Sequence, residues 1–211
     1  MLAMLAGESL EGSIRDALEA HRPRTYPMPG ARAAAVLIPV VGGSEPSLIF
    51  TLRTDTVRSH PGQISFPGGA IDPDDASPYA AARREASEEI GLPTEEGRYL
   101  GELDTFPTFV SGFVVTPFLV WLDGSPELRP NPAEVAEVIQ VPIAAFRDEI
   151  REDAGFTLKE RTYPTEAWIW EGHVIWGVTG RIMRELLQIL GEAGVADPPG
   201  GDGSWIHPNL P

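Results

Sequence analysis

The chain has 211 residues, of which 42% are hydrophobic; it contains no cysteine and carries a formal net charge of −15. This length predicts one domain with a proper core, and the lack of cysteine excludes disulfides and thiolate zinc sites, so the cytoplasm is the expected location. The negative charge argues against a nucleic-acid interface, whereas a small anionic ligand can bind where arginines or a cation invert the local field.

No segment of the sequence is predicted to enter a membrane or to direct secretion. The longest apolar run, residues 33–41, contains Pro39 and is far shorter than the roughly 20 residues that a bilayer span needs. The first residues place no basic group ahead of their apolar stretch, so we expect no secretory signal. A small molecule is therefore the expected partner, with no nucleic acid and no membrane, and the oligomeric state is left open.

Residues 1–30 are predicted to form a short helix followed by a proline-rich connector. Ser9 is suited to cap this helix, because its side-chain oxygen can accept a backbone N–H of the first turn. Leu10, Ile14 and Leu18 fall on one side of the helix. We therefore expect this side to pack against the rest of the protein.

Residues 31–193 are expected to form the main domain, and residues 194–211 a flexible tail rich in proline and glycine. Runs of β-branched and aromatic residues, separated by turn residues, predict strands within the domain. These strands are residues 31–41, 48–54, 62–69, 98–106, 112–122, 134–142, 156–164 and 167–177. The stretch 62–69 is expected to end in a Gly-Gly turn.

Helices are predicted between and after these strands. Ser77 is suited to cap a helix that continues to Ile90 and that Gly91 ends. A short helix is expected over residues 142–150 and an amphipathic helix over residues 178–194. This order of elements predicts an α+β fold, with a mixed sheet and helices on both of its faces.

The second predicted helix concentrates like charge. Glu85, Glu88 and Glu89 fall within an arc of about 100°, beside an apolar stripe for the core. Carboxylates at these spacings repel each other by roughly 0.2–0.5 kcal/mol per pair, and a divalent cation would remove that repulsion. Several hard oxygen ligands are what Mg²⁺ or Mn²⁺ prefers. The alternative is a solvated acidic face with Arg83 and Arg84 as its ion-pair partners.

A glycine-rich stretch precedes this helix. The sequence SFPGGAID, residues 65–72, predicts a tight turn. Glycine lets the backbone approach a ligand that a side chain would block. A carbonyl oxygen of Gly68 or Gly69 is therefore a candidate to join the glutamates at one cation.

The glycines and the glutamate helix together resemble the signature of the Nudix hydrolases, G-x5-E-x7-R-E-U-x-E-E-x-G-U, in which U is a bulky aliphatic residue. Gly69 opens the pattern, and REASEEIGL, residues 84–92, closes it. Two positions depart from the signature. Asp75 replaces the first glutamate, with one extra residue before Arg84, and Ala86 replaces the first bulky aliphatic residue.

These departures and the preceding residues resemble the coenzyme A pyrophosphatase branch of the family. In that branch an R…R-x-H-x-G-x-x-x-F-P-G-G stretch precedes the signature, and the same aspartate and extra residue occur. The likeness covers roughly residues 33–190. The residues that match the upstream stretch are Arg53, Arg58, His60, Gly62, Gln63, Phe66, Pro67, Gly68 and Gly69.

This resemblance implies a Nudix α/β/α sandwich, in which the glutamate helix packs on a mixed sheet. It also implies Mg²⁺- or Mn²⁺-dependent hydrolysis of coenzyme A, or of its acyl or oxidised forms, to 4′-phosphopantetheine and adenosine 3′,5′-bisphosphate. The same chemistry on ADP-ribose, NADH or another nucleoside diphosphate derivative is the first alternative. A nucleotide-binding module without catalysis is the second, although such a module should have lost the glutamates that this helix retains.

The resemblance also implies roles for individual residues. Glu85 and Glu89 are the first metal ligands, the carbonyl of Gly68 is a further one, and Glu88 is either a ligand or the base that deprotonates water. Arg84 is expected to orient a neighbouring glutamate. The expected contacts to the substrate are Arg53, Arg58, His60 and Gln63.

Other polar residues are weaker candidates. His60 alone is equally consistent with a structural histidine that fixes the following turn. Glu134 and Glu137 could supply a base from a loop, but exposed strand and turn positions explain them more simply. The remaining histidines show no ligand spacing; they are His21, His173 and His207.

Overall fold

The computed structural model describes residues 9–55, 62–108, 111–147, 150–158, 161–192 and 194, with the backbone alone at 147, 150–158 and 161–166. The predicted C-terminal tail lies outside the described residues, apart from residue 194.

Helices and strands are mixed along the described chain. The helices are α1 (Leu10–Ala20), α2 (Pro78–Ile90), the 3₁₀ helix η1 (Ile143–Arg147) and α3 (Gly177–Glu192). The strands are β1 (Arg32–Val41), β2 (Ser47–Arg53), β3 (Ile64–Ser65), β4 (Gly68–Ala70), β5 (Arg98–Glu102), β6 (Phe106–Thr108), β7 (Phe113–Leu122), β8 (Val135–Pro142), β9 (Ile150–Leu158), β10 (Arg161–Trp170) and β11 (His173–Ile175).

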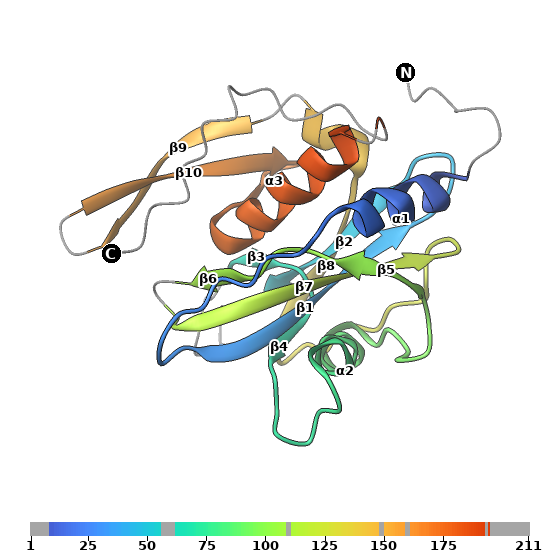
Figure 1. Ribbon diagram of the computed structural model, residues 1–211, viewed down its shortest axis with the longest axis horizontal. Coiled ribbons are helices and arrows are strands. Elements are labelled where there is room, and N and C mark those ends of the chain that lie inside the picture. The colour runs from blue at the N-terminus through green and yellow to red at the C-terminus, as the bar shows by residue number, and fades with distance from the viewer. Residues whose placement is uncertain are drawn as a thin grey trace.

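An eight-stranded mixed sheet forms the centre of the described structure (Figure 1). Its main order is β3-β2-β1-β7-β5, while β4 pairs with β1, β6 with β7, and β8 with β2. β1 and β7 run parallel, and the other pairs are antiparallel. Helix α2 covers one face, whereas α1, α3 and the small sheet β11-β10-β9 lie on the other (Figure 1). The predicted α+β class, with helices on both faces of a mixed sheet, is therefore confirmed.

Strand β1 is buried on both faces of the sheet. Ala35 and Leu37 belong to the apolar cluster under α2. Ile38 and Val40 belong to the cluster that α1 and α3 cover. A strand buried on both sides reads as a nearly continuous apolar run, which explains the sequence of this segment.

Strands β1 and β2 diverge, and the segment 64–70 fills the gap between them. β1 pairs with β2 at Val40 and Val41, near its end, and with β4 near its start. Pro39 lies in β1 between these two sets of pairs, on an edge where the ladder is interrupted. A proline is tolerated there because no partner strand requires its missing N–H.

Helix α2 begins and ends as the sequence predicts. The side chain of Ser77 accepts the N–H of Ala80 at 3.1 Å, and Gly91 ends the helix in the left-handed region, with φ of 69°. Ala82 and Ala86 are fully buried. Ala86 takes the place of the bulky aliphatic residue of the signature, and small side chains allow the helix to lie close to the sheet.

Helix α1 packs against β5 through the predicted apolar side. Ser9 accepts the N–H of Gly12 at 3.2 Å, and Ile14 and Leu18 are buried. A Cβ atom at Gly101 would lie 2.8 Å from the Cβ of Leu18, so the helix sits close to the strand. The predicted N-cap and stripe are confirmed.

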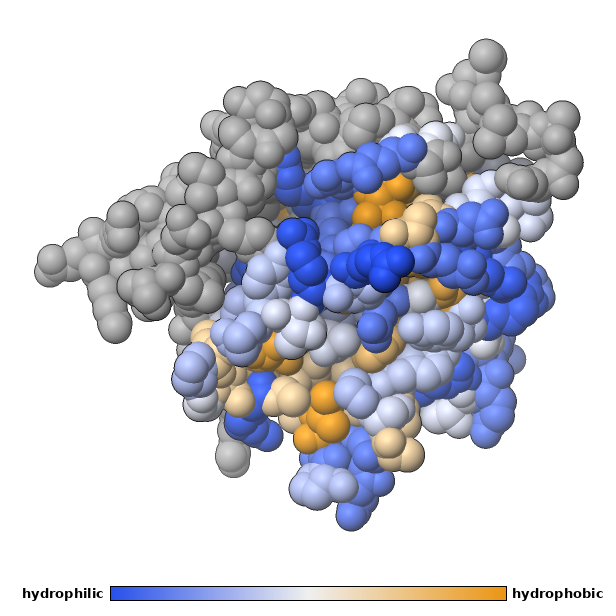
Figure 2. Space-filling model, in the orientation of Figure 1, coloured by the Kyte–Doolittle hydropathy of each residue, from blue (hydrophilic) through white to orange (hydrophobic). Residues whose placement is uncertain are grey.

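The surface is mostly hydrophilic on the side shown in Figure 2, where the apolar patches of the described residues are small and separate. Such scattered patches are normal for a globular surface. None of the helices in the described ranges has the length and apolar composition needed to cross a membrane.

The single strand predicted over residues 98–106 is wrong: β5 and β6 are separated by a break. In this break the N–H of Asp104 donates to Glu185 of α3 at 3.2 Å. The N–H of Thr105 donates to the carbonyl of Arg24 at 3.0 Å. The backbone leaves the ladder because α3 and the N-terminal connector take these hydrogen bonds.

The predicted Gly-Gly turn is also wrong. Gly68 and Gly69 lie in β4, where they pair with Val36 and Ala35 of β1, and the turn follows at residues 73–74. At Gly68, φ is 154° and a Cβ atom would lie 2.4 Å from the carbonyl oxygen of Ala35. Glycine is required there by the neighbouring strand and not by a turn.

The C-terminal strands differ from the prediction in their bounds. The expected pair 156–164 and 167–177 is a three-stranded antiparallel sheet, because β10 pairs with both β9 and β11. The helix expected over 142–150 is the shorter 3₁₀ helix η1.

Replacing Gly68 with alanine should destabilise the fold by about 1–3 kcal/mol more than replacing Gly43. Both glycines have similar φ values, 154° and 149°, so the backbone strain is matched. An added Cβ atom overlaps β1 at Gly68, whereas nothing lies within 4 Å at Gly43. Chemical denaturation of both variants measures the difference, and equal losses would contradict the role of the contact with β1.

Candidate metal and catalytic site

Glu89 is the most buried of the three glutamates on α2, with 2% of the residue exposed. Its carboxylate accepts the N–H of Gly68 at 3.1 Å and a longer hydrogen bond from Nη1 of Arg53 at 3.4 Å. Burial outweighs both contacts and raises the pKa of Glu89 to about 7. A buried carboxylate with such weak compensation favours the binding of a cation.

Glu85 lies one helical turn earlier, with its carboxylate beside Gly69. A Cβ atom at Gly69 would lie 2.6–2.7 Å from the carboxylate atoms of Glu85, so glycine is what leaves room for them. Burial raises the pKa of Glu85, and the hydrogen bond from Arg84 at 2.9 Å opposes that shift. The two glycines of β4 thus bring the backbone close to two of the three glutamates.

Arg84 connects Asp75 to the glutamates. Its Nε and Nη2 donate to the two oxygens of Asp75, each at 3.0 Å, which is the strong bidentate geometry. Its Nη1 donates to Glu85 at 2.9 Å and to Glu88 at 3.2 Å. This pairing holds the pKa of Asp75 below its usual range. Asp75 replaces the first glutamate of the signature, and its carboxylate still binds Arg84.

The alternative interpretation, a solvated acidic face with Arg83 and Arg84 as its ion-pair partners, holds only in part. Arg84 does pair with glutamates, but Arg83 donates instead to the hydroxyl of Tyr79 at 2.7 Å and to the carbonyl of Glu96 at 3.0 Å. The side chain of Glu88 is 59% exposed and contacts Arg84. The three glutamates therefore differ in environment, from fully buried to exposed, although they share one side of the helix.

Arg53 and Gln63 lie at the two ends of the loop between β2 and β3. The N–H of Arg53 donates to the carbonyl of Gln63 at 3.0 Å, while its guanidinium contacts Glu89. The chain thus leaves and re-enters the sheet beside this glutamate. Arg58 and His60 belong to this loop but lie outside the described residues, so their roles, like that of the Gln63 side chain, stay predictions.

Comparison with known proteins identifies the family. The NUDIX domain model matches residues 31–161 of the chain. The chain belongs to the Nudix family. It is 37% identical over 158 residues to an uncharacterized Nudix hydrolase NudL of Photorhabdus laumondii, covering 74% of this chain and 84% of that protein. It is 40% identical over 164 residues to the NudL of Cronobacter sakazakii, covering 76% and 84%.

The fold agrees with the family. The crystal structure of a MutT/nudix family protein from Enterococcus faecalis matches with a TM-score of 0.52, covering 82% of this chain and 66% of that chain. The sequence identity is 13%, so this likeness concerns the fold alone. The Nudix resemblance drawn from the signature is confirmed, while the coenzyme A branch stays a prediction.

Nudix hydrolases generally use divalent metal ions, and the donors on the Nudix helix α2 fit such an ion. The candidate ligands are all oxygens, which suits Mg²⁺ or Mn²⁺. Glu85 and Glu89 have raised pKa values because they are buried, and a cation would stabilise their ionised forms. The N–H of Gly68 contacts Glu89; its carbonyl as a ligand stays a prediction.

Glu134 lies closer to the Nudix helix than the sequence indicates. Its charge contributes to the raised pKa of both Glu85 and Glu89. The loop before β8 is held there because the N–H of Asn131 donates to the carbonyl of Glu89 at 2.8 Å, and that of Thr54 to the carbonyl of Glu134 at 2.9 Å. The sequence offered one signal, an acidic residue just before a predicted strand, and could not show what that loop contacts.

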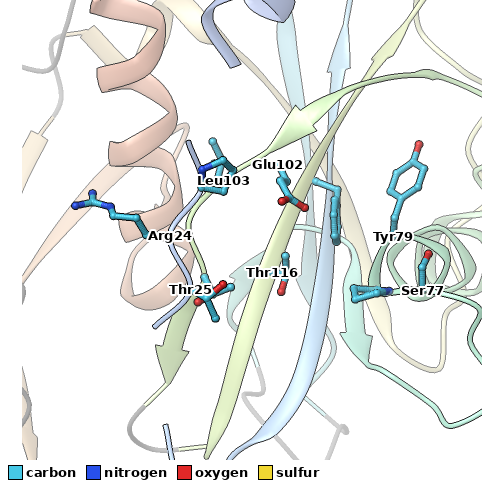
Figure 3. A pocket seen from close by; sticks show the side chains of 11 residues that line it. Arg24, Thr25, Ser77, Tyr79, Glu102, Leu103 and Thr116 are labelled. Carbon is cyan, nitrogen blue, oxygen red and sulfur yellow. The ribbon is translucent and has the colours of Figure 1, made fainter. Parts of the chain in front are cut away.

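A hollow of about 430 Å³ opens elsewhere, between the N-terminal connector, the start of α2, β5 and β7 (Figure 3). Arg24 and Thr25 line one side, and Ser77 and Tyr79 the other. None of the three glutamates of the Nudix helix lines it. We therefore place the candidate chemistry at the carboxylate cluster and not in this hollow.

Metal binding at the Nudix helix should strengthen as the pH rises through about 7, because burial raises the pKa of Glu89 to about 7 and a ligand must lose its proton. Calorimetry with Mn²⁺ above and below this pH measures the change. Glu89→Gln should weaken Mn²⁺ binding and abolish its change with pH. The exposed Glu88 is the control: after Glu88→Gln, Mn²⁺ binding should still strengthen as the pH rises.

The same shift affects the metal-free fold in the opposite direction. The folded state prefers the protonated Glu89, so the stability of the metal-free protein should fall as the pH rises from the usual glutamate range through about 7.

A wild-type Mn²⁺ affinity that does not change across this range would contradict the assignment of Glu89 as a ligand.

Arg84→Gln should lower turnover about 100-fold, since Glu85 and Glu88 lose the guanidinium that positions them. Asp75→Asn should act through the same arginine, so adding it to Arg84→Gln should lower turnover no further. Arg83→Gln is the matched control on the same helix and should stay near wild type. Steady-state kinetics measure the turnover of each variant, and melting temperatures check that it folds. If the losses from Asp75→Asn and Arg84→Gln add up, Asp75 does not act through Arg84.

Proposed function

We propose that the chain is a metal-dependent pyrophosphohydrolase of coenzyme A, or of its acyl or oxidised derivatives. Water adds to one phosphorus of the pyrophosphate, and a bond of the bridging oxygen breaks. The products are 4′-phosphopantetheine and adenosine 3′,5′-bisphosphate. Membership of the Nudix family supports hydrolysis of a small pyrophosphate-containing nucleotide derivative, and the sequence motif that precedes the Nudix signature supports the choice of coenzyme A.

The observation that carries this proposal is the position of the loop between β2 and β3. This loop bears the upstream motif that resembles the coenzyme A branch, including Arg58 and His60. Both of its ends are joined by the hydrogen bond between Arg53 and Gln63, and Arg53 contacts Glu89. Both ends of the loop therefore lie at the candidate metal site, and we infer that its cationic residues contact the phosphates of a substrate.

The guanidinium of Arg53 supports this assignment. Its Nε atom is buried and has no hydrogen-bond partner among the described residues, so one donor of the guanidinium is left unused by them. Arginine suits phosphate because its donors form a planar fork. Coenzyme A carries a 3′-phosphate besides its pyrophosphate, and we assign Arg58 and His60 as the further contacts that this group needs.

The residues of the Nudix helix divide the work of the reaction. A divalent cation, when bound, supplies charge stabilisation at the phosphoryl oxygens and lowers the pKa of the attacking water. Glu85 and Glu89 would hold that cation, and Arg84 fixes the direction of the Glu85 carboxylate. We assign the exposed Glu88 as the base that accepts the proton of the water, with Glu134, from the loop before β8, as the alternative.

Product analysis tests the proposal. The purified protein is incubated in parallel with coenzyme A, dephospho-coenzyme A, ADP-ribose and NADH, with Mg²⁺ or Mn²⁺ and with a chelator control, and the nucleotides are separated by chromatography. We expect metal-dependent release of adenosine 3′,5′-bisphosphate from coenzyme A, with coenzyme A preferred over the other three compounds.

The other outcomes separate the chemistry from the substrate. Preferred cleavage of ADP-ribose or NADH would retain the Nudix chemistry and reject coenzyme A. Equal rates on coenzyme A and dephospho-coenzyme A would reject a contact to the 3′-phosphate. Cleavage of none of them would reject the proposal and favour a binding module.

A further inference from the structure

Three side chains from distant parts of the chain converge on the face of the sheet opposite the Nudix helix. His21 follows α1, Asp104 lies in the break between β5 and β6, and Glu185 lies on α3. Nε2 of His21 is 3.2 Å from Oδ1 of Asp104 and 3.2 Å from Oε1 of Glu185. One nitrogen or oxygen from each residue lies within 4.8 Å of the others.

This cluster contains buried polar atoms without hydrogen-bond partners in the described structure. Nε2 of His21 and Oε2 of Glu185 are both buried, and neither has a partner there. Both carboxylates lie near the imidazole nitrogen, but neither is aligned with it as a hydrogen bond requires. Buried polar atoms are rarely left without partners, so each such atom calls for an explanation such as a missing ion or water.

The spacing of the cluster suits a tetrahedral metal ion. Zn²⁺ binds nitrogen and oxygen ligands at about 2.0–2.2 Å, which places neighbouring ligands of a tetrahedron about 3.3–3.6 Å apart. The two distances from the imidazole nitrogen are both 3.2 Å, close to that edge. To seat the ion, the imidazole nitrogen would move slightly away from the two carboxylate oxygens.

An outer shell of hydrogen bonds already orients the two carboxylates. The N–H of Arg24 donates to Oδ1 of Asp104 at 2.8 Å, and its Nε donates to Oδ2 at 2.9 Å; Arg24 extends toward α3 in Figure 3. The N–H of Asp104 donates to Oε1 of Glu185 at 3.2 Å. Such outer partners are typical of metal sites.

Two arginines among the described residues act on the charge of the cluster. Arg24 compensates Asp104, whereas the guanidinium of Arg181, which interacts electrostatically with Glu185, donates to the carbonyl of Pro107 at 3.0 Å. Burial and the neighbouring Asp104 raise the pKa of Glu185 to about 7. A cation beside this carboxylate would offset both effects.

We propose that His21, Asp104 and Glu185 bind a transition-metal ion, Zn²⁺ by preference, which fastens the N-terminal connector and the β5–β6 break to α3. The imidazole ligand distinguishes this site from the oxygen-only site of the Nudix helix. Because the ion joins segments that are distant in the sequence, its binding stabilises the folded state. The site does not depend on which nucleotide the enzyme hydrolyses.

Titration with Co²⁺, a spectroscopic substitute for Zn²⁺, tests the site. The chelator-treated full-length protein is titrated in excess Mg²⁺, which occupies the oxygen-only site. We expect one Co²⁺ per chain with visible absorption, its displacement by Zn²⁺, and a higher melting temperature with Zn²⁺. His21→Gln and Glu185→Gln should each weaken Co²⁺ binding at least about tenfold, the lower end of what loss of an outer-shell partner costs.

His173→Gln is the matched control. Nε2 of His173 lies 3.7 Å from Glu137, the one carboxylate that the described residues place beside it, so His173 should be dispensable for Co²⁺ binding. Circular dichroism checks the fold, and Glu185→Gln keeps the side-chain shape if His21→Gln does not fold. The proposal is overturned if no such Co²⁺ absorption appears, which would indicate a simple ion pair between His21 and the carboxylates. It is also overturned if the absorption survives both His21→Gln and Glu185→Gln.

Discussion

The burial of one carboxylate, that of Glu89, organises the half of the structure that carries the candidate metal site. Removing a carboxylate from water is costly unless hydrogen bonds or a cation compensate it. Here β1 and β2 diverge, the segment between them supplies the N–H of Gly68, and the end of β2 supplies Arg53. These contacts leave the pKa of Glu89 at about 7. The fold thus holds a carboxylate in place and leaves it in need of a positive charge.

The repulsion expected on the Nudix helix is resolved by different means at each glutamate. Arg84 offsets Glu85 and Glu88 from within the helix, and Asp75 fixes that arginine from the preceding loop. Glu89 depends on the sheet instead. The helix can reach the sheet because its facing residues are small, as at Ala86. A bulky residue there would move the whole helix outward, and with it the carboxylates that lie beside β4.

The features predicted correctly from sequence depend on neighbours in the chain. Ser77 and Gly91 bound α2 as expected, because caps are local hydrogen bonds. The Gly-Gly turn was predicted wrongly, because the pairing of Gly68 is decided by β1, which is distant in the sequence. The helical wheel placed Glu89 on the correct side of α2, yet it could not show what covers that side. The proximity of Glu134 likewise depends on a loop that the sheet positions.

The glutamates of the Nudix helix and the cluster around Glu185 both lie where a strand ladder is interrupted, and for the same reason. A backbone N–H that leaves a ladder must find another acceptor. After the break between β3 and β4, the N–H of Gly68 donates to Glu89 of α2. In the break between β5 and β6, the N–H of Asp104 donates to Glu185 of α3. Each interruption thus draws a helical carboxylate against one face of the sheet, and the two faces acquire their polar centres from breaks in the same sheet.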